Sequence, residues 1–152
     1  MDELYGTPRK PAGKGVKKYE RDTDGNVLDN PTTCLVSQFK PREGVTKYIW
    51  LVLTNGDIVV GEEYELSQRI LLNGELIDLK LGHPTLCQGK RARIGGELEL
   101  DDRRKTGVLN NHSGRYSKDQ GRKERNLQNA YIVFCDALPQ IHLSKKWNPY
   151  YS

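Results

Sequence analysis

Short runs of apolar residues, separated by turn-forming pairs, dominate the middle of the chain. In KYIWLVLTNGDIVVGEEYEL, two runs rich in β-branched and aromatic residues flank Asn55-Gly56. Asn-Gly favours the type I′ turn of a tight hairpin, because both central residues of that turn need positive φ. The pattern predicts strands over residues 47–54 and 57–64. Period-two alternation places on one face of the first strand Ile49, Leu51 and Leu53.

Two further pairs of strands follow from the same kind of pattern. Asn73-Gly74 divides RILLNGELIDLKL and predicts a second hairpin. Residues 91–100 and 106–110 are β-rich runs on either side of the charged turn DDRRK, and they predict two more strands. The chain is therefore expected to form about six short strands in a small antiparallel β-sheet.

An apolar stripe at helical period marks the last third of the chain, and its members are Leu127, Ala130, Tyr131, Phe134 and Leu138. Ser117 can act as the N-cap, and Gln120 falls at the capping-box position. Pro139 ends the stripe, because proline has no N–H to donate within a helix. The pattern predicts an α+β fold in which one C-terminal helix, starting near Ser117, closes the sheet.

The two ends of the chain carry little apolar periodicity. Residues 1–33 contain several glycines, prolines and basic residues, among them Arg9 and Lys14, and are predicted to form a flexible basic arm. Residues 34–146 are predicted to form a single α+β domain, which suits a chain of 152 residues. Residues 147–152, WNPYYS, are expected to form a C-terminal tail.

Charge and composition narrow the functional classes only a little. The net charge of +4 is concentrated in residues 9–18, 90–93, 103–105 and 115–125. Such clusters attract nucleic acid, a phosphorylated cofactor or an acidic partner, or they form an ordinary solvated surface. No run approaches the roughly 18 apolar residues of a membrane span, and no signal-peptide pattern is present. We expect no membrane association, and a protein that is cytoplasmic or delivered into another cell without a cleavable signal.

The cysteines predict neither a disulfide framework nor a metal site. Cys34, Cys87 and Cys135 are widely separated and lack the spacing of zinc ligands. We expect reduced thiols in the core and no bound metal.

The segment HSGRY, residues 112–116, is the first candidate for chemistry. If a helix starts just after it, unpaired N–H groups and the positive end of the helix dipole lie beside it. Gly114 would permit close backbone approach, while Ser113 and Arg115 would add a hydroxyl and a guanidinium. Together they predict an anion site for phosphate or diphosphate. The alternative is a plain capping turn with a charged surface.

A second candidate lies upstream in LGHPTLCQGKRARIGGELEL. His83 and Thr85 stand two residues apart, which on an extended strand points both side chains to one face. Glu97 follows Gly95-Gly96, whose missing side chains would let another element pack closely. A histidine, a hydroxyl and a carboxylate from adjacent strands could orient a substrate and act as a general base. The alternative is a sheet with its polar face in water.

These two segments together resemble a pattern in bacterial polymorphic toxin and effector domains, over about residues 81 to 130. The family pattern has a His-Ser-Ser stretch, an Ala-Gly-Glu strand and an Asn-x-Ser-Gly-His-Tyr motif before a helix. The matching residues are His83 and Thr85 in the first motif, Gly96 and Glu97 in the second, and Asn111, Ser113, Gly114 and Tyr116 in the third. The family's histidine in the third motif is Arg115 in this sequence. If that histidine is catalytic in the family, this chain would be inactive or only a binder.

The resemblance implies a toxin or effector domain, and the chemistry to which it points is ADP-ribosyl transfer from NAD. In that role His83 and Thr85 would hold the nicotinamide ribose, Tyr116 would stack on the nicotinamide, and Glu97 would position the nucleophile. Arg115 would bind the diphosphate.

Two other functions stay open on the sequence. One is a non-enzymatic basic module that binds nucleic acid or docks in a larger assembly, through residues 9–18 and the aromatic tail (Trp147, Tyr150 and Tyr151). The other is a ribonuclease that uses His83, His112 and Arg115, because histidine with arginine suffices for acid–base cleavage of RNA.

Overall fold

Eight strands and two α-helices form an α+β fold in the computed structural model, which describes residues 1–13 and 15–152. The strands are β1 (Cys34–Leu35), β2 (Lys47–Leu53), β3 (Ile58–Glu62), β4 (Tyr64–Leu72), β5 (Glu75–Leu81), β6 (Ala92–Leu100), β7 (Thr106–Asn110) and β8 (His142–Lys146). The α-helices are α1 (Asp2–Tyr5) and α2 (Glu124–Ala137), and the 3₁₀ turns are η1 (Lys18–Glu20), η2 (Val36–Gln38), η3 (His83–Leu86) and η4 (Pro149–Tyr151). No helix among the described residues is both long enough and apolar enough to cross a membrane.

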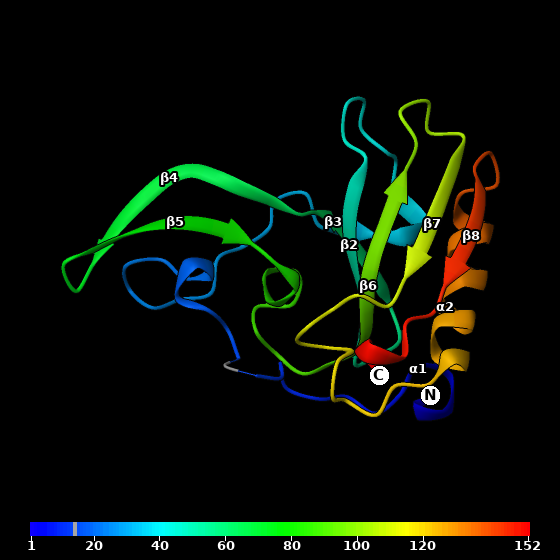
Figure 1. The fold of residues 1–152 in the computed structure, drawn as a ribbon, viewed down its shortest axis with the longest axis horizontal. Helices are drawn as coiled ribbons and strands as arrows, with labels where there is room; N and C mark the ends of the chain where they lie inside the picture. The colour runs from blue at the N-terminus through cyan, green and yellow to red at the C-terminus, as the bar shows by residue number, and fades with distance from the viewer. Residues whose placement is uncertain (14) are drawn as a thin grey trace.

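Six of the strands form one sheet in the order β1-β3-β2-β6-β7-β8, which is antiparallel except for the β7–β8 pair. α2 covers one face of this sheet, and β4 and β5 form a separate two-stranded ribbon that extends away from it (Figure 1). Both Asn-Gly pairs form the predicted turns, with β2 paired to β3 and β4 paired to β5. The prediction of an α+β fold with a C-terminal helix is confirmed. The expected strand number was too low, because β1 and β8 are short strands at the two edges of the sheet.

The central strand β2 is buried on both faces. On one face Trp50 packs against Phe134 of α2, with ring centroids 5.7 Å apart in an edge arrangement. On the other face Ile49 and Leu51 pack in a second apolar cluster, with Leu53 partly buried beside it. The predicted alternation of the first hairpin strand is therefore confirmed. The second cluster is what holds the loop carrying HSGRY against the sheet, because Tyr116 belongs to it.

The helix begins at Glu124, so the prediction of a start near Ser117 is wrong. The Ser117 hydroxyl donates to the Gly95 carbonyl and accepts from the Gly95 N–H, so it is not free to cap a helix. Asp119 and Gly121 have φ of 59° and 70°, and this left-handed backbone interrupts a right-handed helix. The predicted apolar stripe is confirmed, since Leu127 and Phe134 are buried in the main core.

Residues 1–13 and 15–33 lie against the body of the protein. α1 packs on α2, and Arg9 forms a β-bridge with Ala92 of β6. The Arg93 guanidinium, 7% exposed, donates to the Asp2 carboxylate at 2.5 Å and to the Gly6 carbonyl at 2.7 Å. These contacts make the N-terminal segment part of the folded body. Lys14, in the middle of the predicted arm, lies outside the described residues.

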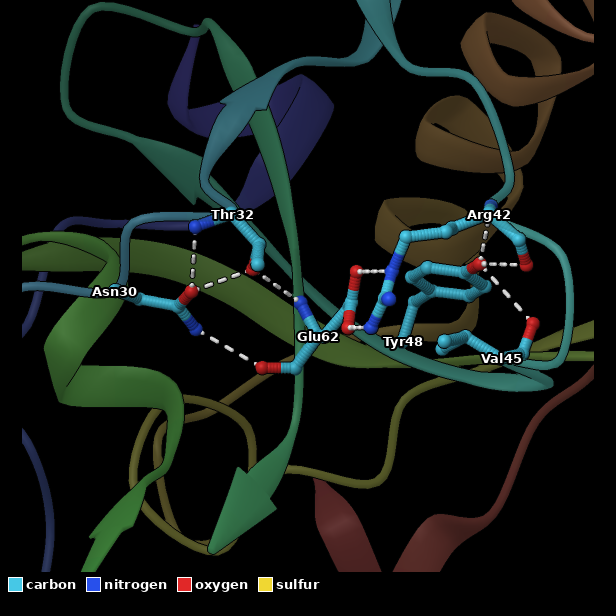
Figure 2. Close-up of polar contacts among 6 residues, drawn as sticks. All are labelled: Asn30, Thr32, Arg42, Val45, Tyr48 and Glu62. Atoms are coloured by element: carbon cyan, nitrogen blue, oxygen red, sulfur yellow. Dashed lines mark hydrogen bonds and ion pairs between the residues drawn. The ribbon is translucent and has the colours of Figure 1, made fainter. Parts of the chain in front are cut away.

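A polar network links residues 30–42 to the end of β3 (Figure 2). The Asn30 amide donates to the Glu62 carbonyl at 3.0 Å, and the Glu62 N–H donates to the Thr32 hydroxyl at 2.8 Å. The Arg42 guanidinium donates twice to the Glu62 carboxylate, at 3.0 and 2.6 Å. The Tyr48 hydroxyl accepts from the Arg42 N–H at 2.8 Å. The network fixes both ends of the loop that carries β1.

Candidate active site

A cleft with a volume of about 370 Å³ opens where β6, η3, the loop after β7 and η4 meet. Its polar lining residues are Glu63, Lys80, His83, Glu97, His112 and Arg115, with Gly114 and Tyr151. The cleft therefore gathers histidines, carboxylates and cations from segments that are far apart in the sequence.

Glu97 supplies the central carboxylate of the cleft. It lies in β6 between β2 and β7, and its side chain is 14% exposed. The Lys47 ammonium lies 3.0 Å from Oε2, and the Asn110 amide donates to Oε1 at 3.3 Å. The hydrogen bond to Glu97 raises the pKa of Lys47, so this lysine stays charged at neutral pH. Two neighbouring strands thus hold the Glu97 carboxylate in place.

His112 lies beside that carboxylate, in the loop that follows β7. Its Nδ1 is 3.6 Å from Glu97 Oε1, and its ring stacks on Tyr151 with centroids 4.7 Å apart. The backbone N–H of His112 donates to Asn110 Oδ1 at 2.9 Å, and this bond sets the position of the loop. Nε2 is buried and has no hydrogen-bond partner among the described residues. Only Nδ1 of this imidazole therefore faces the cleft carboxylate.

The stack on His112 is held by the segment after β8. The Asn111 amide donates to the carbonyls of Asn148 and Tyr151, at 2.9 and 3.1 Å. Asn111 Oδ1 in turn accepts from the Asn148 N–H at 2.8 Å. Asn111 is fully buried, so this clamp fixes Tyr151 against the histidine.

His83 also borders the cleft, but its ring is engaged in the protein interior. Nε2 lies 2.8 Å from the Gly96 carbonyl, which can only accept, so this nitrogen carries the proton. Burial lowers the pKa of His83 from 6.5 to about 4, which leaves the ring neutral at physiological pH. His83 therefore positions β6 at the residue before Glu97 and is a weak candidate for a general base.

Arg115 lines the cleft and is paired with a residue of the N-terminal segment. Its guanidinium forms a bidentate ion pair with Glu20, whose side chain is completely buried; one of the two bonds, from Nη2 to Oε2, is 2.7 Å long. Ser113 is also committed, because its hydroxyl accepts from the Tyr116 N–H at 3.1 Å. No α-helix begins directly after this turn, because α2 begins only at Glu124. The predicted anion site therefore lacks its helix, and its guanidinium already binds a carboxylate.

Thr85 and Tyr116 do not share the cleft with Glu97. Residues 83–86 form the 3₁₀ turn η3 and no strand, so His83 and Thr85 do not lie on one strand face as predicted. The Thr85 hydroxyl donates to the Gly82 carbonyl at 2.6 Å. The fully buried Tyr116 donates to the Lys90 carbonyl at 2.9 Å, and its hydroxyl lies 3.2 Å from the Cys87 sulfur. Of the four residues predicted as catalytic, His83 and Glu97 come together in the cleft.

Sequence reasoning missed two residues of the cleft region, Lys47 and Glu20, and it did not place Tyr151 at the cleft. Lys47 stands at the start of the predicted first strand, and only the pairing of β2 with β6 brings it to Glu97. Glu20 and Arg115 are separated by 95 residues, and no local pattern links them. The sequence predicts the aromatic tail to be a contact segment, but nothing in it indicates that Tyr151 stacks on His112.

The predicted glycine effect at Gly95-Gly96 is confirmed. A Cβ on Gly95 would lie 2.9 Å from Leu51 Cδ1 and 3.3 Å from His83 Cδ2. A Cβ on Gly96 would lie 2.8 Å from the Asn110 carbonyl carbon. The two glycines let His83 and β7 approach β6, which places Glu97 next to His112.

Comparisons with protein-family models, with curated proteins and with solved structures find no match to this chain. Among the described residues, no group of three or more histidine, cysteine, aspartate or glutamate side chains is arranged to hold a metal ion.

Proposed function

We propose that the cleft cleaves RNA by general acid–base chemistry, with Glu97 and His112 as the two proton-transfer groups. The observation that carries this proposal is the pair itself. A carboxylate and an imidazole nitrogen lie 3.6 Å apart at the wall of one solvent-accessible cleft. A positioned acid and base contribute typically about 10²–10⁴-fold each to such reactions.

The proposed reaction is an attack of the ribose 2′-oxygen on the adjacent phosphorus. Glu97 accepts the proton of the 2′-hydroxyl as the O2′–P bond forms. The P–O5′ bond breaks, and protonated His112 gives the proton on Nδ1 to the leaving O5′. The products are a 2′,3′-cyclic phosphate and a 5′-hydroxyl, and the proton taken up by Glu97 balances the proton lost by His112. Nδ1 is the nitrogen that acts, because Nε2 is buried.

The charges around the pair suit a phosphodiester. Lys47 lies 3.0 Å from Glu97, and Lys80 lines the same cleft. Cations at these places would stabilise the extra negative charge that develops on the phosphate oxygens in the transition state. Lys80 lies 3.7 Å from Glu63 and is 39% exposed, so it can turn toward a bound phosphate.

ADP-ribosyl transfer from NAD is the second candidate, and the position of Glu97 favours it. That reaction needs one carboxylate beside the reacting ribose, and Glu97 shares its cleft with an aromatic ring, Tyr151, and a guanidinium, Arg115. In this geometry Tyr151 replaces Tyr116 as the stacking residue for the nicotinamide. Both candidates keep the wider proposal of a toxin or effector domain that acts on a macromolecule.

The test compares single-stranded RNA and NAD as substrates for the same set of variants. We expect wild-type protein to cleave RNA, and Glu97→Gln and His112→Gln each to lose about 10²–10⁴-fold in rate. Glu99→Gln is the matched control, because Glu99 lies on the same strand but is exposed and does not line the cleft. Loss of NAD that depends on Glu97, without RNA cleavage, would replace the first candidate by the second. If neither substrate reacts, both enzymatic candidates are refuted.

A further inference from the structure

A second and larger cavity, with a volume of about 600 Å³, lies beside the first but shares none of its lining residues. The turn η3 contributes to both, with His83 in the cleft and Thr85 and Leu86 in this cavity. Its other walls come from residues 29–33, the end of β2 and residues 87–91. The cavity is large enough for a drug-sized ligand, since such sites occupy about 300–1,000 Å³.

One part of this cavity is an apolar surface formed by Leu53 and Leu86. Leu86 is buried and packs against β3 at Gly61, where an added Cβ would lie 2.8 Å from Leu86 Cδ2. A flat ring can therefore bury its face against side chains that are already fixed.

Thr33 lines the same cavity, and its buried hydroxyl makes no hydrogen bond with any described residue. The hydroxyl would have to rotate toward a ligand to reach it. The neighbouring Asn30 differs, because its amide nitrogen donates to Glu62 and its oxygen accepts from the N–H and hydroxyl of Thr32 (Figure 2). A buried polar group without a partner is unfavourable, so Thr33 offers a hydrogen bond that a ligand would complete.

Two cations complete the site. Lys90 and Arg91 line the cavity with exposed side chains, and neither makes an ion pair with a described residue. Asp29 is the one carboxylate among the described lining residues, and it accepts a single long hydrogen bond of 3.4 Å from Gln88. The cavity therefore combines an apolar surface, hydroxyl and carboxylate groups, and two cations that form no ion pair with a described residue.

We propose that this cavity binds a mononucleotide. The base would lie against Leu53 and Leu86, the ribose hydroxyls would hydrogen-bond to Thr33 and Asp29, and the phosphate would bind Lys90 and Arg91. A nucleoside without phosphate would leave both cations unused, and inorganic phosphate would leave the apolar surface and the Thr33 hydroxyl unused. The proposal rests on residues outside the Glu97 cleft, so it stands independently of the proposed RNA cleavage.

The experiment is isothermal titration of the wild-type protein with AMP, GMP, CMP and UMP, with adenosine and inorganic phosphate as partial ligands. We expect at least one mononucleotide to bind more tightly than either partial ligand. Arg91→Ala should weaken that binding about tenfold to a hundredfold, because a charged hydrogen bond is lost. Thr33→Val, which keeps the shape of the side chain, should weaken it roughly threefold to tenfold.

Arg103→Ala is the charge-matched control, since Arg103 is an exposed arginine that does not line the cavity. Equal weakening by Arg91→Ala and Arg103→Ala would overturn the proposal, because binding would then reflect overall charge. Absence of binding by all four mononucleotides would also overturn it, as would binding of inorganic phosphate that is equally tight. Binding that disappears in Glu97→Gln but persists in Arg91→Ala would place the nucleotide in the cleft instead. Whether the protein cleaves RNA does not change how these titrations are interpreted.

Discussion

Replacement of Arg115 by alanine should destabilise the protein strongly, because it leaves a buried carboxylate without its partner. The Glu20 side chain is completely buried, and its carboxylate receives two bonds from the Arg115 guanidinium and one from the Lys17 N–H at 2.9 Å. Arg115→Ala removes two of these three donors. Breaking a buried ion pair from one side costs about 3–5 kcal/mol.

The expected loss is large enough to measure by two methods. For a chain of this size, 1 kcal/mol corresponds to about 2–4 °C in melting temperature, so Arg115→Ala should melt about 6–20 °C below wild type. Urea titration should show a lower midpoint with an unchanged m-value. The double variant Glu20→Gln/Arg115→Met should lose less than Arg115→Ala alone, because no charge then remains buried.

Two outcomes would refute this reasoning. An Arg115→Ala protein within about 1 kcal/mol of wild type would mean that water or another cation reaches Glu20. If the stability losses of Glu20→Gln and Arg115→Met add up to that of the double variant, the two residues do not interact, since contacting residues show coupling of about 0.5–3 kcal/mol. From the sequence, Arg115 is predicted to bind a phosphate or diphosphate, and no local pattern indicates that it pairs with Glu20, 95 residues away.

Three further predictions concern the elements that position the site. Below pH 6.5 the unfolded chain binds a proton at His83, whereas the native protein binds it only below about pH 4, so the free energy of unfolding should fall by about 3 kcal/mol as the pH drops through this window. Urea titrations at several pH values measure this fall, and a His83→Gln variant should lose this component. Gly96→Ala should cost about 3 kcal/mol or more, because the added Cβ overlaps the backbone of Asn110 at the end of β7, whereas Gly114→Ala should be nearly neutral, since nothing lies within 4 Å of its Cβ; equal melting temperatures would contradict the packing described. Deletion of residues 1–13 should lower the melting temperature by several degrees, because it leaves the Arg93 guanidinium buried without its carboxylate; an unchanged value would show a dispensable arm.

The strands were predictable because their signals are local. The Asn-Gly pairs at 55–56 and 73–74 specify tight turns, and period-two alternation fixes which residues face inward. The helical stripe was equally local, so α2 was predicted with the correct face and the correct end. Patterns of this kind depend on residues within a few positions of one another, and the sequence contains them in full.

The start of α2 was not predictable, because tertiary contacts decide it. Ser117 has the chemistry of an N-cap, but its hydroxyl bonds the buried backbone of Gly95 instead. The Arg122 guanidinium donates to the carbonyls of Tyr116 and Thr7, which holds the segment before α2 in turns. The local preference for a helix loses to several hydrogen bonds with distant parts of the chain.

The candidate site was predictable only in part, for the same reason. His83 and Glu97 were identified from their residue types and their neighbouring glycines. The partners that decide their roles, Gly96 for His83 and Lys47 and His112 for Glu97, are set by strand pairing and loop packing. Residue type alone could not distinguish a buried neutral histidine from one that faces a carboxylate.

The most direct test of the account is cleavage of a DNA oligonucleotide that contains one ribonucleotide. The proposed reaction uses the 2′-hydroxyl as nucleophile, so we expect cleavage only on the 3′ side of the ribonucleotide, with a 2′,3′-cyclic phosphate detected by mass spectrometry. Glu97→Gln and His112→Gln should each form this product about 10²–10⁴-fold more slowly, while Glu99→Gln should form it at the wild-type rate. Cleavage at deoxyribonucleotides, or a wild-type rate in Glu97→Gln, would contradict the role of the Glu97–His112 pair.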